Sequence, residues 1–183
     1  MAAANWFRYT YLAHLSRPKA VRHLYRLVSR SCASRIVEVG ISDLKRAIAM
    51  IEVAQRACVD KPINYTAIDW FESRPSSGSA LPLKEAYRQL RATGANVRLV
   101  PGAPGAALSA AANAHQHTDL ILIGPEVTDA DMKRAWFFVP RMLHADSTVL
   151  REHRDSSGQP VFSSVSRTQI AEWASCDATR RAA

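Results

Sequence analysis

The chain is poor in glycine and cysteine. Its 183 residues include only seven glycines and three cysteines, Cys32, Cys58 and Cys176. An odd number of widely spaced cysteines favours reduced thiols in a cytosolic protein over a disulfide framework or a metal knuckle. No apolar run approaches the roughly 18 residues that a membrane-spanning helix needs. The first residues lack a cationic segment followed by an apolar block, so we expect no secretory signal and a cytoplasmic protein.

Several catalytic signatures are also missing. The sequence has no Gly-x-Ser-x-Gly elbow and no Walker loop, which argues against a hydrolase or a P-loop enzyme. His115 and His117 are too close in a predicted helix to share a face, and no carboxylate stands at ligand spacing from them. We therefore predict that the protein holds no metal ion.

Positive charge is in excess. Lysine and arginine number 24 against 16 aspartate and glutamate residues, which gives a net charge of +8 and a pI of about 9.9. Such a balance favours polyanions as partners. However, the basic residues are spread over the chain, and no dense block with interleaved aromatics occurs. Arg22, Arg26 and Arg30 form one stripe at helical spacing, which is typical of a solvated face. Nucleic acid stays open as a partner but is not favoured.

Short apolar strands alternate with amphipathic helices along the chain. The 48% hydrophobic and 22% charged content is typical of soluble globular proteins, and the length suits one domain. The alternation predicts a doubly wound, mostly parallel Rossmann-like sheet with right-handed crossovers. Strands are expected at 35–39, 63–68, 96–100, 118–124 and 147–151. Helices are expected at 18–30, 83–93, 106–117, 129–144 and from the N-cap Ser42 onward, and Pro140 is expected to interrupt and kink the helix over 129–144.

The two ends of the chain are predicted to lie outside the central domain. Residues 1–30 form a helical extension, with a short aromatic helix before Pro18, and residues 31–176 form the α/β domain. In that domain, 160–166 is expected to be an antiparallel strand and 167–175 a last helix. Residues 177–183 are predicted to be a flexible tail. The loop at 71–82 is rich in turn-forming residues and is a candidate lid.

Two carboxylates each follow an apolar strand. Glu38 stands in Arg35-Ile-Val-Glu-Val-Gly40, and Asp69 ends Ile63-Asn-Tyr-Thr-Ala-Ile-Asp69. In a doubly wound domain, ligands bind at the carboxyl ends of the strands, and an acid after the second strand accepts hydrogen bonds from ribose hydroxyls. The pair predicts an adenosyl-binding site between the two strand ends.

These motifs and the order of the elements resemble the class I S-adenosylmethionine-dependent methyltransferases over residues 30–152. The resemblance implies S-adenosylmethionine as cofactor and a methyl acceptor as substrate. It implies that Glu38 and Gly40 border the methionine and ribose parts of the cofactor, with Ile41 and Ser42 completing the turn. Asp69 would bind the ribose. The adenine would lie beside Trp70 and against Gly102 and Ala103.

The sequence departs from the family pattern in three places. The family's first turn reads acidic-x-Gly-x-Gly-x-Gly, whereas Ser42 and Leu44 stand at its second and third glycine positions, so the motif is degenerate. Ala103 replaces the acidic residue that often follows the third-strand glycine. Strand four ends in Gly124-Pro125, where many small-molecule O-methyltransferases have a carboxylate. Glu126, two residues later, is a candidate general base, as are His117 and His144.

Four functions fit these observations to different degrees. The leading hypothesis is a methyltransferase-like protein that acts on a small molecule. A catalytically inactive relative that serves as a binding or assembly module is the main alternative. A homodimer stays open as a partner of the chain, whichever function holds. A nucleic-acid methyltransferase would use the positive charge, but the sequence has no Asn/Asp-Pro-Pro-Tyr/Phe motif. An NAD-dependent dehydrogenase is less compatible, because the dinucleotide fingerprint needs more glycines.

Overall fold

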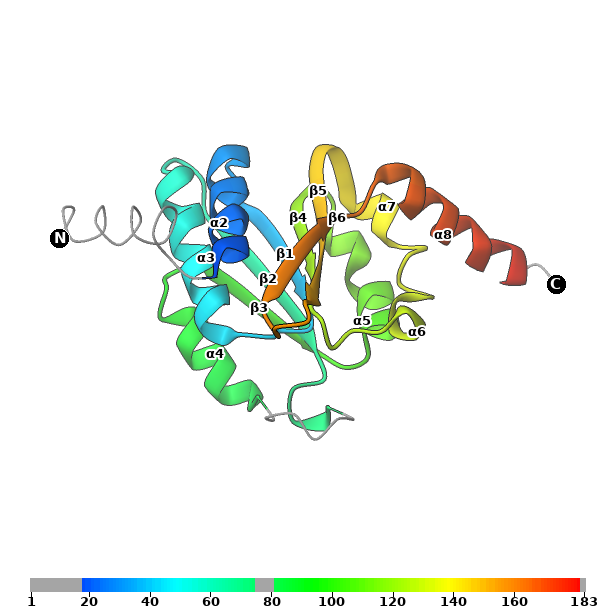
Figure 1. Ribbon diagram of the computed structural model, residues 1–183, viewed down its shortest axis with the longest axis horizontal. Coiled ribbons are helices and arrows are strands. Elements are labelled where there is room, and N and C mark those ends of the chain that lie inside the picture. Colours follow the sequence, from blue (N-terminus) through cyan, green and yellow to red (C-terminus); the bar gives the residue numbers. More distant parts are fainter. Residues whose placement is uncertain (1–17, 75–80, 182–183) are drawn as a thin grey trace.

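The computed structural model describes residues 18–74 and 81–181, so the aromatic helix expected before Pro18 and part of the 71–82 loop lie outside the described residues. Helices and strands alternate along most of the chain (Figure 1). In order they are α2 (Lys19–Ser31), β1 (Arg35–Val39), α3 (Leu44–Ala57), β2 (Asn64–Asp69), η2 (Phe71–Ser73), α4 (Leu83–Arg91), β3 (Asn96–Pro101), α5 (Pro104–Ala111), η3 (Ala112–His115), β4 (Thr118–Ile123), α6 (Asp129–Met132), α7 (Val139–Met142), β5 (Leu143–Arg154), β6 (Pro160–Ser164) and α8 (Arg167–Arg181).

One six-stranded sheet organises the molecule, with the strand order β3-β2-β1-β4-β5-β6. The first five strands are parallel, and β6 pairs with β5 in the antiparallel direction. The chain reverses its direction of travel across the sheet between β1 and β4. Ligands of doubly wound folds bind at such a reversal, at the carboxyl ends of the strands. The predicted doubly wound, mostly parallel sheet is confirmed.

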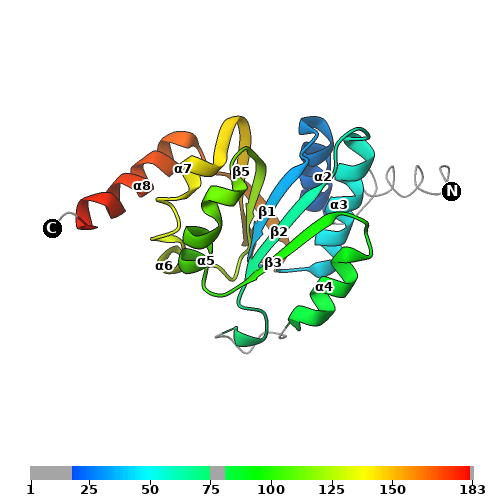
Figure 2. The same ribbon diagram turned by 180° about the vertical axis from the view of Figure 1, so that it is seen from behind.

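Helices cover both faces of the sheet (Figures 1 and 2). Residues of α2, α3 and α4 join Ile36, Tyr65 and Leu120 in one buried cluster. Residues of α5, α6 and α7 join Val37, Ile68 and other residues in a second cluster on the opposite face. Adjacent strand residues point to opposite faces, so a central strand that is buried on both sides consists almost entirely of apolar residues. Glu38 is the exception in β1, and it lies on the face covered by α3.

Three helix predictions were wrong in detail. The helix expected over 129–144 is two short helices, because Thr128 and Asp131 form a capping box that starts α6 and Pro140 lies in the first turn of α7. The N-cap of α3 is Asp43, whose carboxylate accepts hydrogen bonds from the backbone N–H groups of Lys45 and Arg46. Helix α8 continues to Arg181, beyond its expected end at 175.

A disulfide joins two of the three cysteines. Cys32 follows α2 and Cys58 follows α3, and their Cα atoms lie 5.3 Å apart. Helices α2 and α3 pack side by side, which brings residues 26 positions apart in the sequence together. The expectation that these cysteines are reduced thiols was wrong, because the spacing of the residues along the chain carries no information about this helix pairing.

Candidate functional site

Backbone hydrogen bonds hold the carboxyl ends of four strands together. The Gly40 N–H donates to the carbonyl of Ile68 at 2.7 Å, and the Gly102 N–H donates to the carbonyl of Asp69 at 2.9 Å. On the other side, the Gly124 N–H donates to the carbonyl of Val39 at 2.7 Å. The turns after β1 and β3 are therefore adjacent to the end of β2, and the turn after β4 is adjacent to the end of β1. The predicted residues Gly40, Asp69 and Gly102 lie at one place.

Two glycines at this place cannot carry a side chain. Gly40 has φ +77°, and a Cβ atom there would lie 2.5 Å from a methyl carbon of Val127. A Cβ atom on Gly124 would lie 2.1 Å from the carbonyl oxygen of Gly40. Such distances are far below van der Waals contact, so the backbone after β1 and the backbone after β4 touch directly. The glycine at position 40 thus has a local structural reason.

Asp69 is fully buried, and both of its carboxylate oxygens have partners. The backbone N–H groups of Ile41 and Phe71 donate to it at 2.7 and 2.8 Å. The Arg74 guanidinium binds the same carboxylate at both ends, from Nε to Oδ1 at 2.9 Å and from Nη2 to Oδ2 at 2.5 Å. Nη2 also donates to the carbonyl of Ile41 at 2.6 Å. A ribose that binds Asp69 would have to replace the Arg74 side chain.

The Arg74 side chain is largely buried beside Asp69, at the carboxyl ends of the strands. Its side chain is 13% exposed. Hydrogen bonding to Asp69 raises the pKa of Arg74, so the guanidinium is charged at every physiological pH. Glu126, which follows β4, is near enough to add to this electrostatic effect. Among the three candidate bases, Glu126 is the one that lies by the carboxyl ends.

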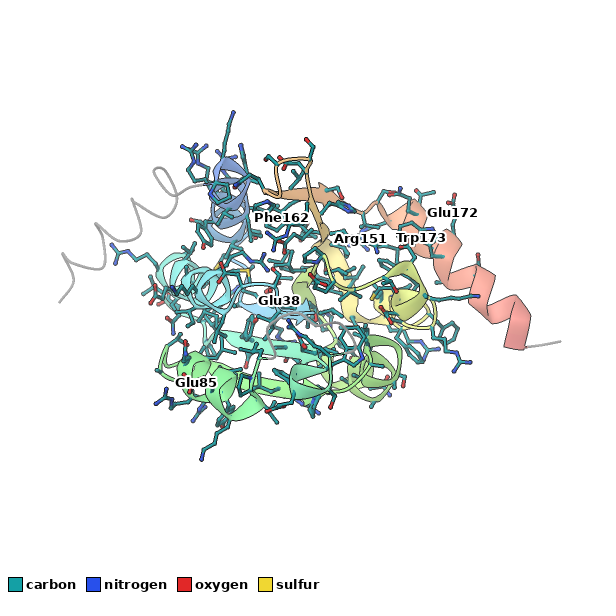
Figure 3. All side chains as sticks on the ribbon, turned by 60° about the horizontal axis from the view of Figure 1, so that its bottom comes forward. Glu38, Glu85, Arg151, Phe162, Glu172 and Trp173 are labelled. Atoms are coloured by element: carbon teal, nitrogen blue, oxygen red, sulfur yellow. A yellow bond between two sulfur atoms is a disulfide. The ribbon has the colours of Figure 1, made fainter. Side chains whose placement is uncertain are left out.

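Glu38 lies beneath α3 in the interior of the protein (Figure 3). Its carboxylate accepts hydrogen bonds from Nη2 of Arg46 and from the hydroxyl of Tyr65, both at 2.6 Å. Burial raises the pKa of Glu38, and the charge of Arg46 opposes this rise. Burial and the adjacent Glu38 carboxylate raise the pKa of Tyr65, so its hydroxyl keeps its proton and donates. Glu38 and Asp69 are therefore each paired with a different arginine, Arg46 and Arg74.

A second buried carboxylate completes the network around Arg46. Nη1 of Arg46 binds Glu152 of β5 at 2.5 Å, and the hydroxyl of Ser42 donates to the same oxygen at 2.8 Å. The guanidinium carbon lies 5.6 Å from the ring centre of Phe162 on β6. Burial disfavours the charged guanidinium, but the two carboxylates outweigh it and raise the pKa of Arg46. Glu38, Arg46 and Glu152 form an ion triad inside the protein.

The remaining predicted residues are divided between this network and the strand ends. Ile41 is buried, and its N–H binds Asp69. Ser42 turns toward Glu152, and Leu44 packs against the cluster under α3, so neither fills the space above the turns. Trp70 is partly buried against the other cluster, and Ala103 is the N-cap of α5.

The two histidines proposed as bases lie at the other end of the sheet. Nε2 of His144 is 3.0 Å from Asp119, near the start of β4, and the rings of His144 and His117 are 6.4 Å apart. These two candidate bases therefore do not lie near the ligand-binding strand ends. His117 directly precedes β4 and His144 stands at the start of β5, and the amino ends of parallel strands lie at the edge opposite their carboxyl ends.

Sequence reasoning missed Arg46, Arg74 and Glu152. Arg46 alone had a usable signal, because it shares the spacing of the apolar residues Met50 and Val53 on the buried face of α3. A charge at such a position needs a buried partner. Arg74 and Glu152 had no such signal, because their partners come from turns and strands distant in the sequence.

No group of three or more histidine, cysteine, aspartate or glutamate side chains that could hold a metal ion occurs within residues 18–74 and 81–175. No helix in the described part of the chain is long and apolar enough to cross a membrane.

No protein-family profile and no curated protein matches the sequence. Solved structures do match the fold. The cofactor-bound Rv0187 protein from MTB superimposes with a TM-score of 0.51 over 82% of this chain and 64% of that one, at 16% identity. The O-methyltransferase TomG from Streptomyces achromogenes, in complex with SAM, also gives 0.51 over 81% of this chain and 64% of its own, at 14% identity. The chain thus spans less than two thirds of the length of either protein.

Proposed function

The chain has the Rossmann-like fold of the class I methyltransferases, and from this premise we propose that it is an S-adenosylmethionine-dependent methyltransferase-like protein that acts on a small molecule. The supporting observation is the meeting of Gly40, Asp69 and Gly102 at the carboxyl ends of β1, β2 and β3. This is where doubly wound folds bind nucleosides. The relatives by fold include a small-molecule pathway enzyme, the TomG O-methyltransferase involved in tomaymycin synthesis.

The residues at the strand ends match the cofactor in type. Asp69 would accept the ribose hydroxyls, and Gly40 and Ile41 would offer backbone groups beside the methionine part. Trp70 would lie beside the adenine, next to Gly102 and Ala103. In the proposed site, Glu38 and Ser42 support the turn from below, through Arg46 and Glu152. The bound cofactor would supply an activated methyl group. The protein would position the acceptor and exclude water, and Glu126 is the carboxylate available to remove a proton.

Arg74 sets a condition on this function. Because it occupies both oxygens of Asp69, the cofactor ribose fits only when the guanidinium withdraws. Removing a guanidinium from a buried carboxylate costs free energy, which the cofactor's own contacts must offset. We therefore expect wild-type affinity for the cofactor to be lower than that of a variant without the arginine.

Isothermal titration with S-adenosylhomocysteine tests the proposal. The wild-type protein should release heat, and Arg74→Gln should bind about tenfold more tightly, because a charged hydrogen bond no longer has to be broken. Asp69→Asn should bind more weakly than either. Arg88→Gln, which removes an exposed arginine on α4, is the matched control and should bind as the wild type does. Circular dichroism verifies that each variant is folded. If neither wild type nor Arg74→Gln binds at millimolar ligand, the proposal fails.

One observation favours a second candidate function, a non-catalytic binding or assembly module. Both carboxylate oxygens of Asp69 already accept hydrogen bonds from protein donors, which is the arrangement expected of a site that has lost its ligand. This candidate predicts no binding of S-adenosylhomocysteine and no methyl transfer to any acceptor in a small-molecule screen. Cytoplasmic location and a homodimer stay predictions, as do the limits of the N-terminal extension and tail. Nucleic acid stays a less favoured acceptor.

A further inference from the structure

A hollow of about 380 Å³ lies at the amino ends of β1, β2 and β3, far from the turns that carry Gly40 and Asp69. Its walls come from the first residues of these strands and from η3, which follows α5 on the same face of the sheet. The hollow is therefore separate from the strand-end site by the length of β1.

Two rows of neighbouring strand residues form its floor. Arg35, Asn64 and Asn96 are in register across β1, β2 and β3, and their row lies at the rim. The amide of Asn96 donates to the side-chain oxygen of Asn64 at 3.2 Å. The next row on the same face consists of Val37, Thr66 and Arg98. Every second residue faces the same way, so the polar side chains of both rows point to one side of the sheet.

The hollow is lined by positive charge without a compensating acid. Arg35, Arg91 and Arg98 line it, and none of the lining residues is aspartate or glutamate. The Arg35 guanidinium is held in place by a hydrogen bond from Nη1 to the carbonyl of Gln116 at 2.9 Å. Asp119 is near the rim but does not line the hollow, and it already binds the N–H groups of Ser34 and Arg35 and the ring of His144. Like charges in a concavity concentrate the field and attract anions.

His115 adds a polar atom that needs a partner. Its Nε2 is buried and has no hydrogen-bond partner among the described residues. Burial and the nearby charge of Arg98 lower the pKa of His115, so the ring is neutral at neutral pH. A buried polar atom without a partner costs free energy unless a ligand or water satisfies it. An anion between Arg98 and His115 would balance the charge of the arginine and give Nε2 of the histidine a hydrogen-bond partner.

From these observations we propose that this hollow binds a phosphate-bearing small molecule. Guanidinium groups bind phosphate oxygens in pairs, and three arginines face this space. The asparagines supply neutral donors and acceptors for a polar body such as a sugar. The volume falls within the range typical of small-molecule sites, about 300 to 1,000 Å³. No phenylalanine, tyrosine or tryptophan lines the hollow, so it lacks the stacking surface by which proteins hold single-stranded nucleic acid.

Titration of the full-length protein with ribose 5-phosphate and with inorganic pyrophosphate tests this inference. Both should bind, and uncharged ribose should not. Arg98→Gln should weaken binding of both about tenfold or more, because it removes a charged contact. Arg98 is exposed on β3, so the substitution should leave the fold intact. Arg88→Gln removes the same charge from α4, outside the hollow, and should change the affinity less than twofold.

Each outcome decides the matter. Equal weakening by Arg98→Gln and Arg88→Gln would mean general attraction by the net charge and would overturn the proposal, as would binding of a single-stranded oligonucleotide alone. Absence of binding at millimolar probe would overturn it too. Binding should persist in saturating S-adenosylhomocysteine and in Asp69→Asn. Displacement by that ligand would instead place the probe at the carboxyl ends. Failure here leaves the proposed cofactor site untouched, because the two tests use different ligands and different variants.

Discussion

Arg46 neutralises two buried carboxylates, Glu38 and Glu152, which would otherwise face each other without a cation between them. Arg46→Met should therefore destabilise the protein by about 3 to 5 kcal/mol, the usual cost of leaving a buried charge without its partner. Urea unfolding followed by circular dichroism measures this change. The triple variant Glu38→Gln, Arg46→Met, Glu152→Gln should recover part of the loss. A loss below about 1 kcal/mol for the single variant would contradict the burial of the triad.

The pairing of Glu38 with Arg46 also gives a prediction for how stability depends on pH. Burial raises the folded-state pKa of Glu38 above its ordinary 4.5, so protonation favours the folded state. This contribution is present below pH 4.5 and is lost as the pH rises through the folded-state pKa. Without Arg46 the pKa of Glu38 rises further. The stability difference between wild type and Arg46→Met should widen as the pH rises above 4.5. Unfolding curves at several pH values test this, and a constant difference would contradict it.

Gly124 has no room for a methyl group, because a Cβ atom would overlap the carbonyl oxygen of Gly40. Gly124→Ala should cost about 3 kcal/mol, since backbone rather than a flexible side chain must move. Gly105, in α5, is the matched control. Its Cβ atom would have ordinary contacts of 3.4 Å and longer, so Gly105→Ala should be neutral or gain up to about 1 kcal/mol of helix propensity. Thermal unfolding distinguishes the two variants, and equal effects would contradict the close approach.

At the scale of elements, the start of α3 depends on Asp43. Its carboxylate caps two N–H groups, so Asp43→Ala should cost about 1 kcal/mol. The neighbouring Ser42→Ala removes a hydrogen bond to Glu152 and leaves the cap intact. Urea unfolding should therefore detect the cap in the first variant, and double-mutant analysis with Glu152→Gln should show coupling only for Ser42. Coupling of Asp43 with Glu152 would contradict this division of roles.

The elements with strong periodic patterns were predictable from the sequence. β1 and β6 formed near their expected bounds because each is short, apolar or β-branched, and set off by turn residues. The region 129–144 was not predictable as two helices, because Met132, Trp136, Val139 and Leu143 keep helical spacing across the break. Tertiary contacts decide there: Trp136 is buried in the second cluster, and its ring centre lies 4.6 Å from that of Trp173 of α8, with the two rings tilted by 47°. Figure 3 shows Trp173 on α8.

The candidate site, too, was predictable from the sequence only in part. That Gly40 and Asp69 meet at one end of the sheet follows from parallel strands, whose carboxyl ends are always on the same side. That Arg74 occupies Asp69, and that Glu38 is paired under α3, depends on side-chain directions in turns and on a strand far along the chain. No local pattern encodes such pairings.

At the scale of the whole molecule, the Cys32–Cys58 disulfide ties helix α2 to the sheet through α3. Closing a loop of 26 residues should stabilise the fold by about 3 kcal/mol through the unfolded state. Thiol titration in denaturant should count two fewer thiols before reduction than after it. The double variant Cys32→Ser, Cys58→Ser should unfold at lower urea than wild type. Three free thiols without reductant would contradict the bond.

Arg98 also matters because β3 is the terminal strand of the sheet. An edge strand offers unpaired N–H and C=O groups that can recruit a strand from another copy of the chain, and charged residues discourage such self-association. Arg98 and the closing Pro101 thus disfavour the pairing of a further strand at this edge. Replacing the arginine with a β-branched apolar residue, as in Arg98→Ile, should make the protein prone to aggregate. The edge strand that carries the proposed anion-binding arginine therefore also protects the protein's solubility.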